Sequence, residues 1–393
     1  MNVLSTLIRL PAAAINCAFS LNCAFTLICA FSLNRAFTLS CASSLNRASP
    51  LICAFLLNRA FSLSRAVSLS SAVLLGAFVG LASAAENYEP PRTESGHPDL
   101  QGYWTNASLT QLQRNERYSE LVIPPSLIEE YTSSHHPNVR QATDDGLVQG
   151  ELLDGSDLGR GRGYNAFWVD PGTRYGVVKG EARTSWIVSP TNGRIPFSDA
   201  GKQRRSEGYA RFSGNDGPEG RALGERCLIG FGSTGGPPMN NVLYNNMYQI
   251  VQTPGYVMIL VEMVNDARII PLTDSHRPAE HQRWLGDSIG YWDGDTLVVE
   301  TVNLHPQQAF RNAAPLSDKG KIVERFSRYS DEQILYTFEV ADPEYYTEPW
   351  RGEMSFNATQ ERLYEYACHE GNYGLPGILG GARRADFDAE QAP

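Results

Sequence analysis

The sequence predicts a mainly β protein: an antiparallel barrel or sandwich with a few short helices. Short runs rich in Val, Ile, Tyr and Phe recur along the chain, and clusters of Gly, Pro, Asn and Asp separate them. Several such runs alternate apolar and polar residues, which is typical of strands with one buried face. No repeat at the spacing of propeller blades occurs after residue 85. A closed or nearly closed sheet, or a pair of packed sheets, fits these observations best.

Residues 1–71 form a leader that we do not expect to fold. A hexad recurs from Ile15 to Ser71, as in AFSLNC and AFTLIC, and a period of six matches neither a helix nor a strand. Five cysteines occupy the hexad position that arginine fills elsewhere. Because Cys and Arg codons can differ by one base, a translated DNA repeat explains this pattern better than a disulfide framework does.

Residues 65–85 have the form of a signal peptide. Arg65 supplies a positive flank, Ala72–Leu81 an apolar run, and Ala82-Ser83-Ala84 a small-residue cleavage pattern. The apolar run is too short for a comfortable membrane span. We therefore expect cleavage near Ala84 or Ala85, a periplasmic or extracellular protein, and no stable membrane anchor.

The remaining chain, residues 86–393, is predicted to be a single β-rich domain that binds a small molecule or sugar. Residues 1–85 contain five Arg, no Lys and no acidic residue, so the rest keeps 28 basic against 43 acidic side chains, a net charge of −15. Nucleic acids and anionic membranes require a basic surface, so neither is an expected partner. The charge favours neutral or cationic ligands.

Only Cys227 and Cys368 remain after cleavage. Two cysteines in an exported chain favour a disulfide, which we predict. A reactive thiol or a ligand for a soft metal is the alternative.

The predicted elements begin with a strand at Pro98–Asn106. Its Gly102-Tyr103-Trp104 has the Gly-x-Trp form found on the first strand of lipocalin-like barrels, which is why we expect a barrel of that type. Ser126 can cap a short helix, and a second helix is expected around Ala200–Ala210. Strands are also expected at Ala166–Asp170, Tyr175–Lys179 and Thr184–Val188.

The clearest β region spans residues 244–272. Tyr256–Val264 is apolar on both faces, so this strand should be buried on both sides. Glu262 would then be a carboxyl group among apolar neighbours, and its pKa should rise unless a cation meets it. Arg268 is the obvious structural partner; the functional alternative is an acid that holds its proton.

A hairpin is predicted in WLGDSIGYWDGDTLVVET, with Asp293-Gly294 as its two turn residues. This register places Asp287 directly opposite Glu300 on one face. Two facing carboxylates repel unless solvent, a cation or a proton relieves them. They are either a solvated rim pair or an acid–base pair lining a pocket.

Two further segments carry candidate residues. His276–Trp284 resembles one helical turn, which would bring His281 and Trp284 to the start of the hairpin. Glu361–Glu370 alternates like a last strand, and His369 and Glu370 would lie at its end beside a Gly-rich turn. Residues beyond Ala382 look like a frayed tail.

Long phrases of the chain, including YNNMYQIVQTPGYVMILVEM, RWLGDSIGYWDGDTLVVETVN and YEYACHEGNYG, resemble a family of exported β-rich proteins with many members in environmental bacteria. The resemblance covers nearly the whole chain after the signal peptide. It implies export and a β-rich fold, but it implies no reaction and no catalytic residues.

Two functions remain open. The first is an exported enzyme without a metal or other cofactor, which uses carboxylate and histidine side chains on a neutral ring-containing small molecule or sugar, by hydrolysis, elimination or isomerisation. Its candidate catalytic residues are Asp287, Glu300, His369, Glu370 and Glu262. Its candidate ligand-binding residues are Trp284, Tyr291, Arg268, His281, Tyr364 and Tyr366. The second is a non-catalytic periplasmic barrel that binds an apolar or aromatic ligand.

Overall fold

The computed structural model describes residues 88–135, 171–211, 214–230, 235–308 and 314–391. The predicted leader (1–71), the signal peptide (65–85) and the strand expected at 166–170 lie outside these residues. Residues Asn87–Pro393 form one compact unit. Within the described ranges, no helix has both the length and the apolar character needed to cross a bilayer.

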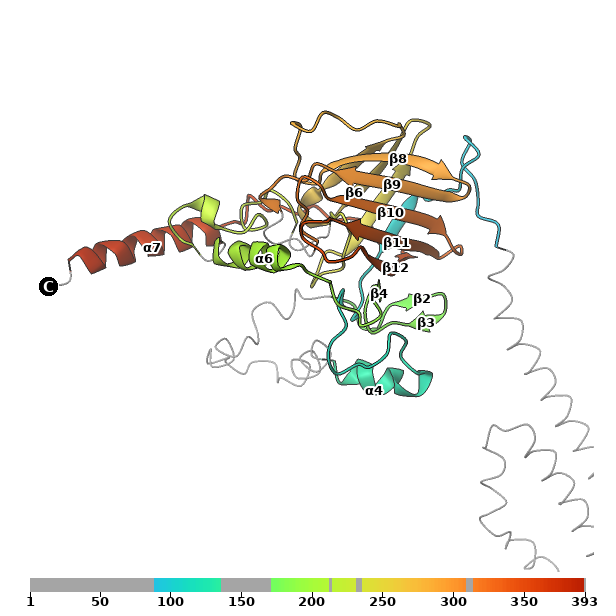
Figure 1. Cartoon of the computed structure of the whole chain (residues 1–393), viewed down its shortest axis with the longest axis horizontal. Coiled ribbons are helices and arrows are strands. Elements are labelled where there is room, and N and C mark those ends of the chain that lie inside the picture. The colour runs from blue at the N-terminus through green and yellow to red at the C-terminus, as the bar shows by residue number, and fades with distance from the viewer. Residues whose placement is uncertain (1–87, 136–170, 212–213, 231–234, 309–313, 392–393) are drawn as a thin grey trace, which may run out of the picture. The chain divides into compact units, whose positions relative to one another are not determined.

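One antiparallel sheet dominates the described part of the chain (Figure 1). Its strands follow the order β7-β6-β5-β1-β12-β11-β10-β9-β8, and β4 pairs with β12. The two ends of this order approach each other through a parallel bridge between Leu272 and Gly290. The sheet is therefore a nearly closed barrel, and the predicted mainly β, antiparallel barrel with a few short helices is confirmed.

The strands of this sheet are short and are joined mostly in sequence. Their bounds are β1 Gly102–Thr105, β4 Ile187–Ser189, β5 Met247–Gln252, β6 Tyr256–Val261, β7 Ala267–Pro271, β8 Asp287–Asp293, β9 Thr296–Val302, β10 Lys321–Arg328, β11 Gln333–Ala341 and β12 Trp350–Ala358. A separate two-stranded sheet pairs β2 Val177–Val178 with β3 Glu181–Ala182.

The described helices lie outside the sheet. They are η1 Pro125–Leu127, α4 Ile128–Ser133, α6 Asp199–Arg211, η4 Pro218–Gly220, η5 Met263–Asn265 and α7 Gly374–Glu390. The predicted helices near Ser126 and over 200–210 are confirmed. The prediction of a frayed tail beyond Ala382 was wrong, because α7 continues to Glu390. The helical turn at 276–284 was also wrong: this segment is irregular, with one hydrogen-bonded turn from Pro278 to His281.

The barrel closes because a glycine stands where β8 meets β7. A Cβ atom on Gly290 would lie 3.0 Å from a side-chain carbon of Ile270 and 3.1 Å from one of Leu272. A larger residue there would force these two side chains to shift by a few tenths of an ångström. The absent side chain thus allows the close approach of the two edges.

Alternate residues of each strand point into a core that includes large aromatic side chains. Trp104, Tyr248, Phe326, Tyr336 and Phe356 are at most 2% exposed. Trp104 lies on β1, where its indole N–H donates to the carbonyl of Leu100 (3.0 Å). The guanidinium of Arg328 covers its ring at 4.9 Å from the centroid. The barrel interior is therefore packed with side chains at these positions.

A buried ion pair crosses this core. Arg268 on β7 donates to both carboxylate oxygens of Glu324 on β10 (Nη1–Oε1 2.9 Å), and the Tyr336 hydroxyl donates to the same carboxylate (2.7 Å). Arg268 and Glu324 are 3% and 0% exposed. Burial alone would lower the pKa of Arg268, but the adjacent Glu324 outweighs it and keeps that pKa raised.

The β8–β9 hairpin has a different register from the predicted one. Its turn residues are Gly294 and Asp295, so Asp287 pairs with Val302, and Glu300 pairs with Ile289. The predicted Asp287–Glu300 pairing is therefore wrong. Gly294 has φ +59°, and a glycine at the first of two turn positions is typical of a type II′ turn. Asp295 is also held at the turn by a two-bond ion pair with Arg92 (2.8 and 2.9 Å).

Candidate functional site

A cleft of about 790 Å³ lies where β6 ends and where the segment after β12 passes over it. We call it the Glu262 cleft. Its lining comes from the end of β1, residues 172–173, the start of β5, the residue after β6, and the irregular segment from Thr359 to Tyr366. The lining residues used below are Tyr244, Asn245, Glu262, Glu361, Arg362, Tyr364 and Tyr366.

Glu262 is the buried acid of this cleft, with 5% of its surface exposed. One of its oxygens accepts the backbone N–H of Tyr364 at 3.2 Å, and the side chain of Asn245 is a second hydrogen-bond partner. Burial raises the pKa of Glu262 above its usual value, and the negative charge of nearby Glu361 raises it further. The hydrogen bonds oppose this rise but do not cancel it.

The predicted ion pair between Glu262 and Arg268 is wrong. Arg268 points into the core and pairs with Glu324, whereas Glu262 lies just beyond the last residue of β6. Within the described residues Glu262 has no ion pair with a cation. The strand is also not buried on both sides, since Tyr256 is 54% exposed and Met258 and Leu260 are partly exposed. The structure therefore leaves Glu262 without the predicted cationic partner, and burial raises its pKa.

The backbone around Glu262 is strained. Val264 and Asn265 directly after it have φ +60° and +52°, and its partner Asn245 has φ +55°. Asn tolerates this left-handed conformation, but a β-branched residue such as Val rarely adopts it. Such residues cost about 1–3 kcal/mol each and gather at functional sites. Here they form the tight reversal that ends β6 at the wall of the cleft.

Three tyrosines give the cleft an aromatic lining. The hydroxyls of Tyr244 and Tyr366 share a hydrogen bond, and burial raises the pKa of both, so both stay neutral. Tyr364 is 77% exposed. An exposed tyrosine ring beside buried polar groups is suited to stacking on a ring-shaped ligand.

The structure brings together three of the predicted site residues: Glu262, Tyr364 and Tyr366. The last strand, predicted to carry His369 and Glu370 at its end, is wrong. Residues 361–370 are irregular and pair with no described strand. His369 and Glu370 follow on this segment in an exposed turn and do not line the cleft.

Asp287 and Glu300 lie elsewhere, on the face of the hairpin opposite to the core. Asp287 accepts hydrogen bonds from the backbone N–H of Arg277 (2.8 Å) and contacts His276 Nδ1 (3.0 Å). Glu300 pairs with Lys321 at the surface (3.2 Å). Neither residue lines the Glu262 cleft.

The remaining ligand-binding candidates are also apart from the cleft. Tyr291 is 44% exposed on the hairpin, and Arg268 is in the core. Trp284 packs on the ring of His305, with centroids 4.0 Å apart, and His281 is exposed in the preceding loop.

Among the cleft residues used here, sequence reasoning missed Tyr244, Asn245, Glu361 and Arg362. The doublet Asn245-Asn246 at the start of an apolar strand was the available signal, since Asn adopts left-handed conformations more readily than other side chains. Glu361 and Arg362 gave none, because their position depends on a segment whose path no local pattern determines.

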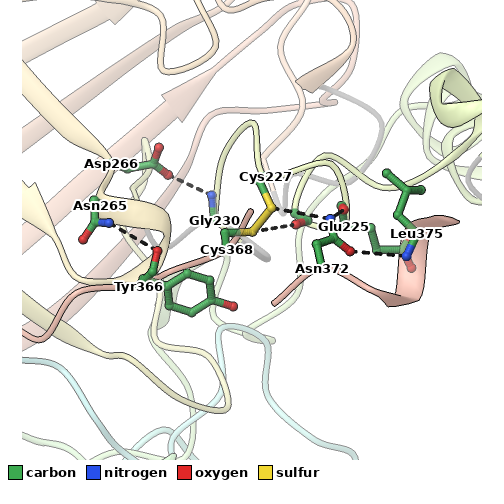
Figure 2. Close-up of a disulfide and its surroundings, with 10 residues drawn as sticks. Glu225, Cys227, Gly230, Asn265, Asp266, Tyr366, Cys368, Asn372 and Leu375 are labelled. Atoms are coloured by element: carbon green, nitrogen blue, oxygen red, sulfur yellow. Dashed lines mark hydrogen bonds between the residues drawn. A yellow bond between two sulfur atoms is a disulfide. The ribbon is translucent and has the colours of Figure 1, made fainter. Parts of the chain in front are cut away.

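The predicted disulfide is confirmed: Cys227 is bonded to Cys368, with Cα atoms 5.8 Å apart (Figure 2). A second hollow of about 630 Å³, here called the Cys368 hollow, lies beside it. It shares Asn245 and Tyr366 with the Glu262 cleft. The disulfide thus lies next to the candidate site.

No group of three or more His, Cys, Asp or Glu side chains that could hold a metal ion occurs in the part of the chain that the structure describes. Comparison of the sequence and fold with family models, curated proteins and solved structures gives no match. The assignment of function therefore depends on the chemistry of the cleft.

Proposed function

We propose that this protein is an exported enzyme that uses Glu262 as an acid–base group on a neutral, ring-containing small molecule or sugar. The observation that carries the proposal is the buried Glu262 carboxyl, with its raised pKa, in the wall of an aromatic cleft. Perturbed carboxyl groups in clefts are typical of catalytic acids and bases. The volume of about 790 Å³ also suits a small organic ligand.

In this proposal Glu262 donates a proton to a substrate oxygen or nitrogen and later takes one back. Its raised pKa makes the protonated form available closer to neutral pH, where a general acid is most effective. Asn245 and the Tyr364 N–H orient the carboxyl group. Such positioned proton transfer contributes about 10²–10⁴-fold to a rate. Hydrolysis, elimination and isomerisation all use this step.

Two neighbours complete the arrangement. Glu361, whose charge acts on Glu262, is the second carboxyl group that a glycoside-type hydrolysis requires. Tyr364 supplies the exposed ring on which a sugar or aromatic ring stacks. Arg362 is a positively charged residue that lines the cleft, and it would stabilise the negative charge that develops on a leaving group.

A screen for thermal stabilisation, with a library of neutral glycosides and aromatic metabolites, would identify ligands, and mass spectrometry would then detect their products. Glu262→Gln should keep the thermal shift and lose turnover by at least about 10²-fold. Glu300→Gln, which removes a surface carboxylate away from the cleft, is the matched control and should keep both.

The alternative is binding without turnover in the same cleft, since the tyrosine lining would hold an aromatic ring whether or not a reaction follows. Ligands recovered unchanged from the wild-type protein, with equal affinity for the Glu262→Gln variant, would favour that alternative. No stabilisation by any ring compound, or a thermal shift that Tyr364→Ala leaves unchanged, would exclude the cleft as the site.

A further inference from the structure

We propose that the Cys227–Cys368 disulfide is a redox latch on the Glu262 cleft: its two-electron reduction releases the segment Thr359–Tyr373 and opens the cleft. As regulation of an enzyme this rests on the proposed function, but the opening itself is a property of the fold. The argument depends on how the segment is held, how a reductant reaches the sulfurs, and what the segment contributes to the cleft.

Apart from the disulfide, separate hydrogen bonds and one packed tyrosine hold the segment. Its backbone makes no ladder with any described strand. Figure 2 shows two of its hydrogen bonds to the rest of the protein: the Asn265 amide donates to the Tyr366 carbonyl (3.3 Å), and the Asn372 amide donates to the Glu225 carbonyl (2.7 Å). The Thr359 N–H also donates to the Tyr103 carbonyl (3.1 Å). Tyr366 packs against the core, whereas Tyr364 and Tyr373 are 77% and 82% exposed, so their rings bury little apolar surface.

The loop that carries Cys227 is attached to the rest of the protein by contacts other than the disulfide. Gly230 donates its N–H to Asp266 (2.8 Å), and Leu223 and Ile229 lie in an apolar cluster with Trp284 and Leu285. Cys227 has φ +56°, a left-handed conformation that a cysteine adopts only at a cost, and reduction would allow it to relax. Reduction should therefore release the C-terminal segment and leave the loop around Cys227 attached to the barrel.

The Cys368 hollow gives a reductant access to the bond. It opens onto Cys368, which is partly exposed, whereas Cys227 is 7% exposed. A thiolate of a dithiol reductant attacks Sγ of Cys368, and Cys227 leaves as a thiolate that takes up a proton. The second thiol of the reductant then displaces Cys368. The products are two protein thiols and the oxidised, cyclic reductant.

The released segment carries much of the cleft. Thr359, Glu361, Arg362, Tyr364 and Tyr366 all line it, and the Tyr364 N–H is a partner of the Glu262 carboxyl group. Without them Glu262 would face water and its pKa would return toward the ordinary value. Reduction would thus remove Tyr364 and Tyr366 from the aromatic lining and abolish the perturbation of Glu262, while leaving the barrel intact.

Hydrogen–deuterium exchange of the oxidised and dithiothreitol-reduced protein tests this proposal. Amides of residues 359–373 should exchange at least tenfold faster after reduction, while those of β10 and β11 keep their rates. The Cys227→Ser/Cys368→Ser variant should match the reduced protein and should not respond to dithiothreitol. The reduced wild type alone suffices if that variant fails to fold.

Two results would overturn the latch. Unchanged exchange in 359–373 after complete reduction would show that the other contacts hold the segment. Faster exchange throughout β10 and β11 would show that the disulfide stabilises the whole fold and not this segment alone. Neither readout needs a substrate, so a failed latch is distinguishable from a failed enzyme assignment, which would appear as absent turnover in the oxidised protein.

Discussion

The carboxyl group of Glu262 accepts a hydrogen bond from the backbone N–H of Tyr364, although 102 positions separate the two residues. This contact joins the end of β6 to the segment that follows β12. It explains how a residue at a strand end becomes buried: a distant, irregular segment lies over it. The chemistry of the cleft thus depends on a tertiary contact between two parts of the chain that are distant in sequence.

Replacing Glu262 with Gln should stabilise the fold at pH 7 but not at pH 4. A carboxyl group whose pKa is raised by folding contributes stability that is complete below its unfolded pKa, near 4.5, and is lost as pH rises through its folded value. The amide does not ionise, so it avoids this loss. Urea unfolding at both pH values measures the difference. For Glu300→Gln, a surface residue paired with Lys321, the change should stay within about 0.5 kcal/mol.

Asp266 should make stability fall between pH 4 and pH 7. Burial raises its pKa to about 6, and the Gly230 N–H only partly opposes this rise. Because the unfolded value lies near 3.8, the wild type should lose on the order of 2 kcal/mol across that range relative to Asp266→Asn. Parallel urea titrations of the two proteins provide the measurement. Equal pH profiles would show that Asp266 ionises normally.

The ion pair between Arg268 and Glu324 should be costly to break from one side. Glu324→Gln leaves a buried guanidinium without its counter-charge, and such changes cost about 3–5 kcal/mol. The double variant Arg268→Met/Glu324→Leu removes both charges and should recover most of this loss. A double-mutant cycle of unfolding free energies tests the coupling, and additive single effects would contradict it.

Gly294→Ala should destabilise the protein by about 1 kcal/mol, because an alanine at φ +59° adopts the left-handed conformation at a cost. A Cβ atom there would meet no neighbour, so the effect isolates the backbone term. Gly255 is the matched control: it also has open space around it but no positive φ, and Gly255→Ala should be close to neutral. Thermal unfolding of both variants gives the comparison.

The sequence predicted the barrel and the disulfide because both depend on patterns along the chain. Alternating apolar residues define strands, and the two cysteines of residues 86–393 leave one pairing. The hairpin register was not predictable from Asp293-Gly294-Asp295 alone, since either dipeptide can form the turn. The distant Arg92, through its ion pair with Asp295, favours the observed choice.

The site was predictable only in part for a related reason. Glu262 was recognisable as an acid at the end of an apolar strand. The alternation in 361–370 fits a strand equally well, but no neighbouring strand is available to it, so Tyr364 and Tyr366 reach the cleft by a different route. The predicted pairing of Arg268 with Glu262 also failed. Arg268 lies close to Glu262 in sequence, but strand alternation directs its side chain into the core, where it pairs with Glu324.

The two bonded cysteines stand 141 residues apart, with most of the barrel encoded between them. During synthesis Cys227 is made long before Cys368, so its thiol has no partner until then. The disulfide can therefore form only after residue 368 has been made, and a product that terminates earlier carries an unpaired thiol.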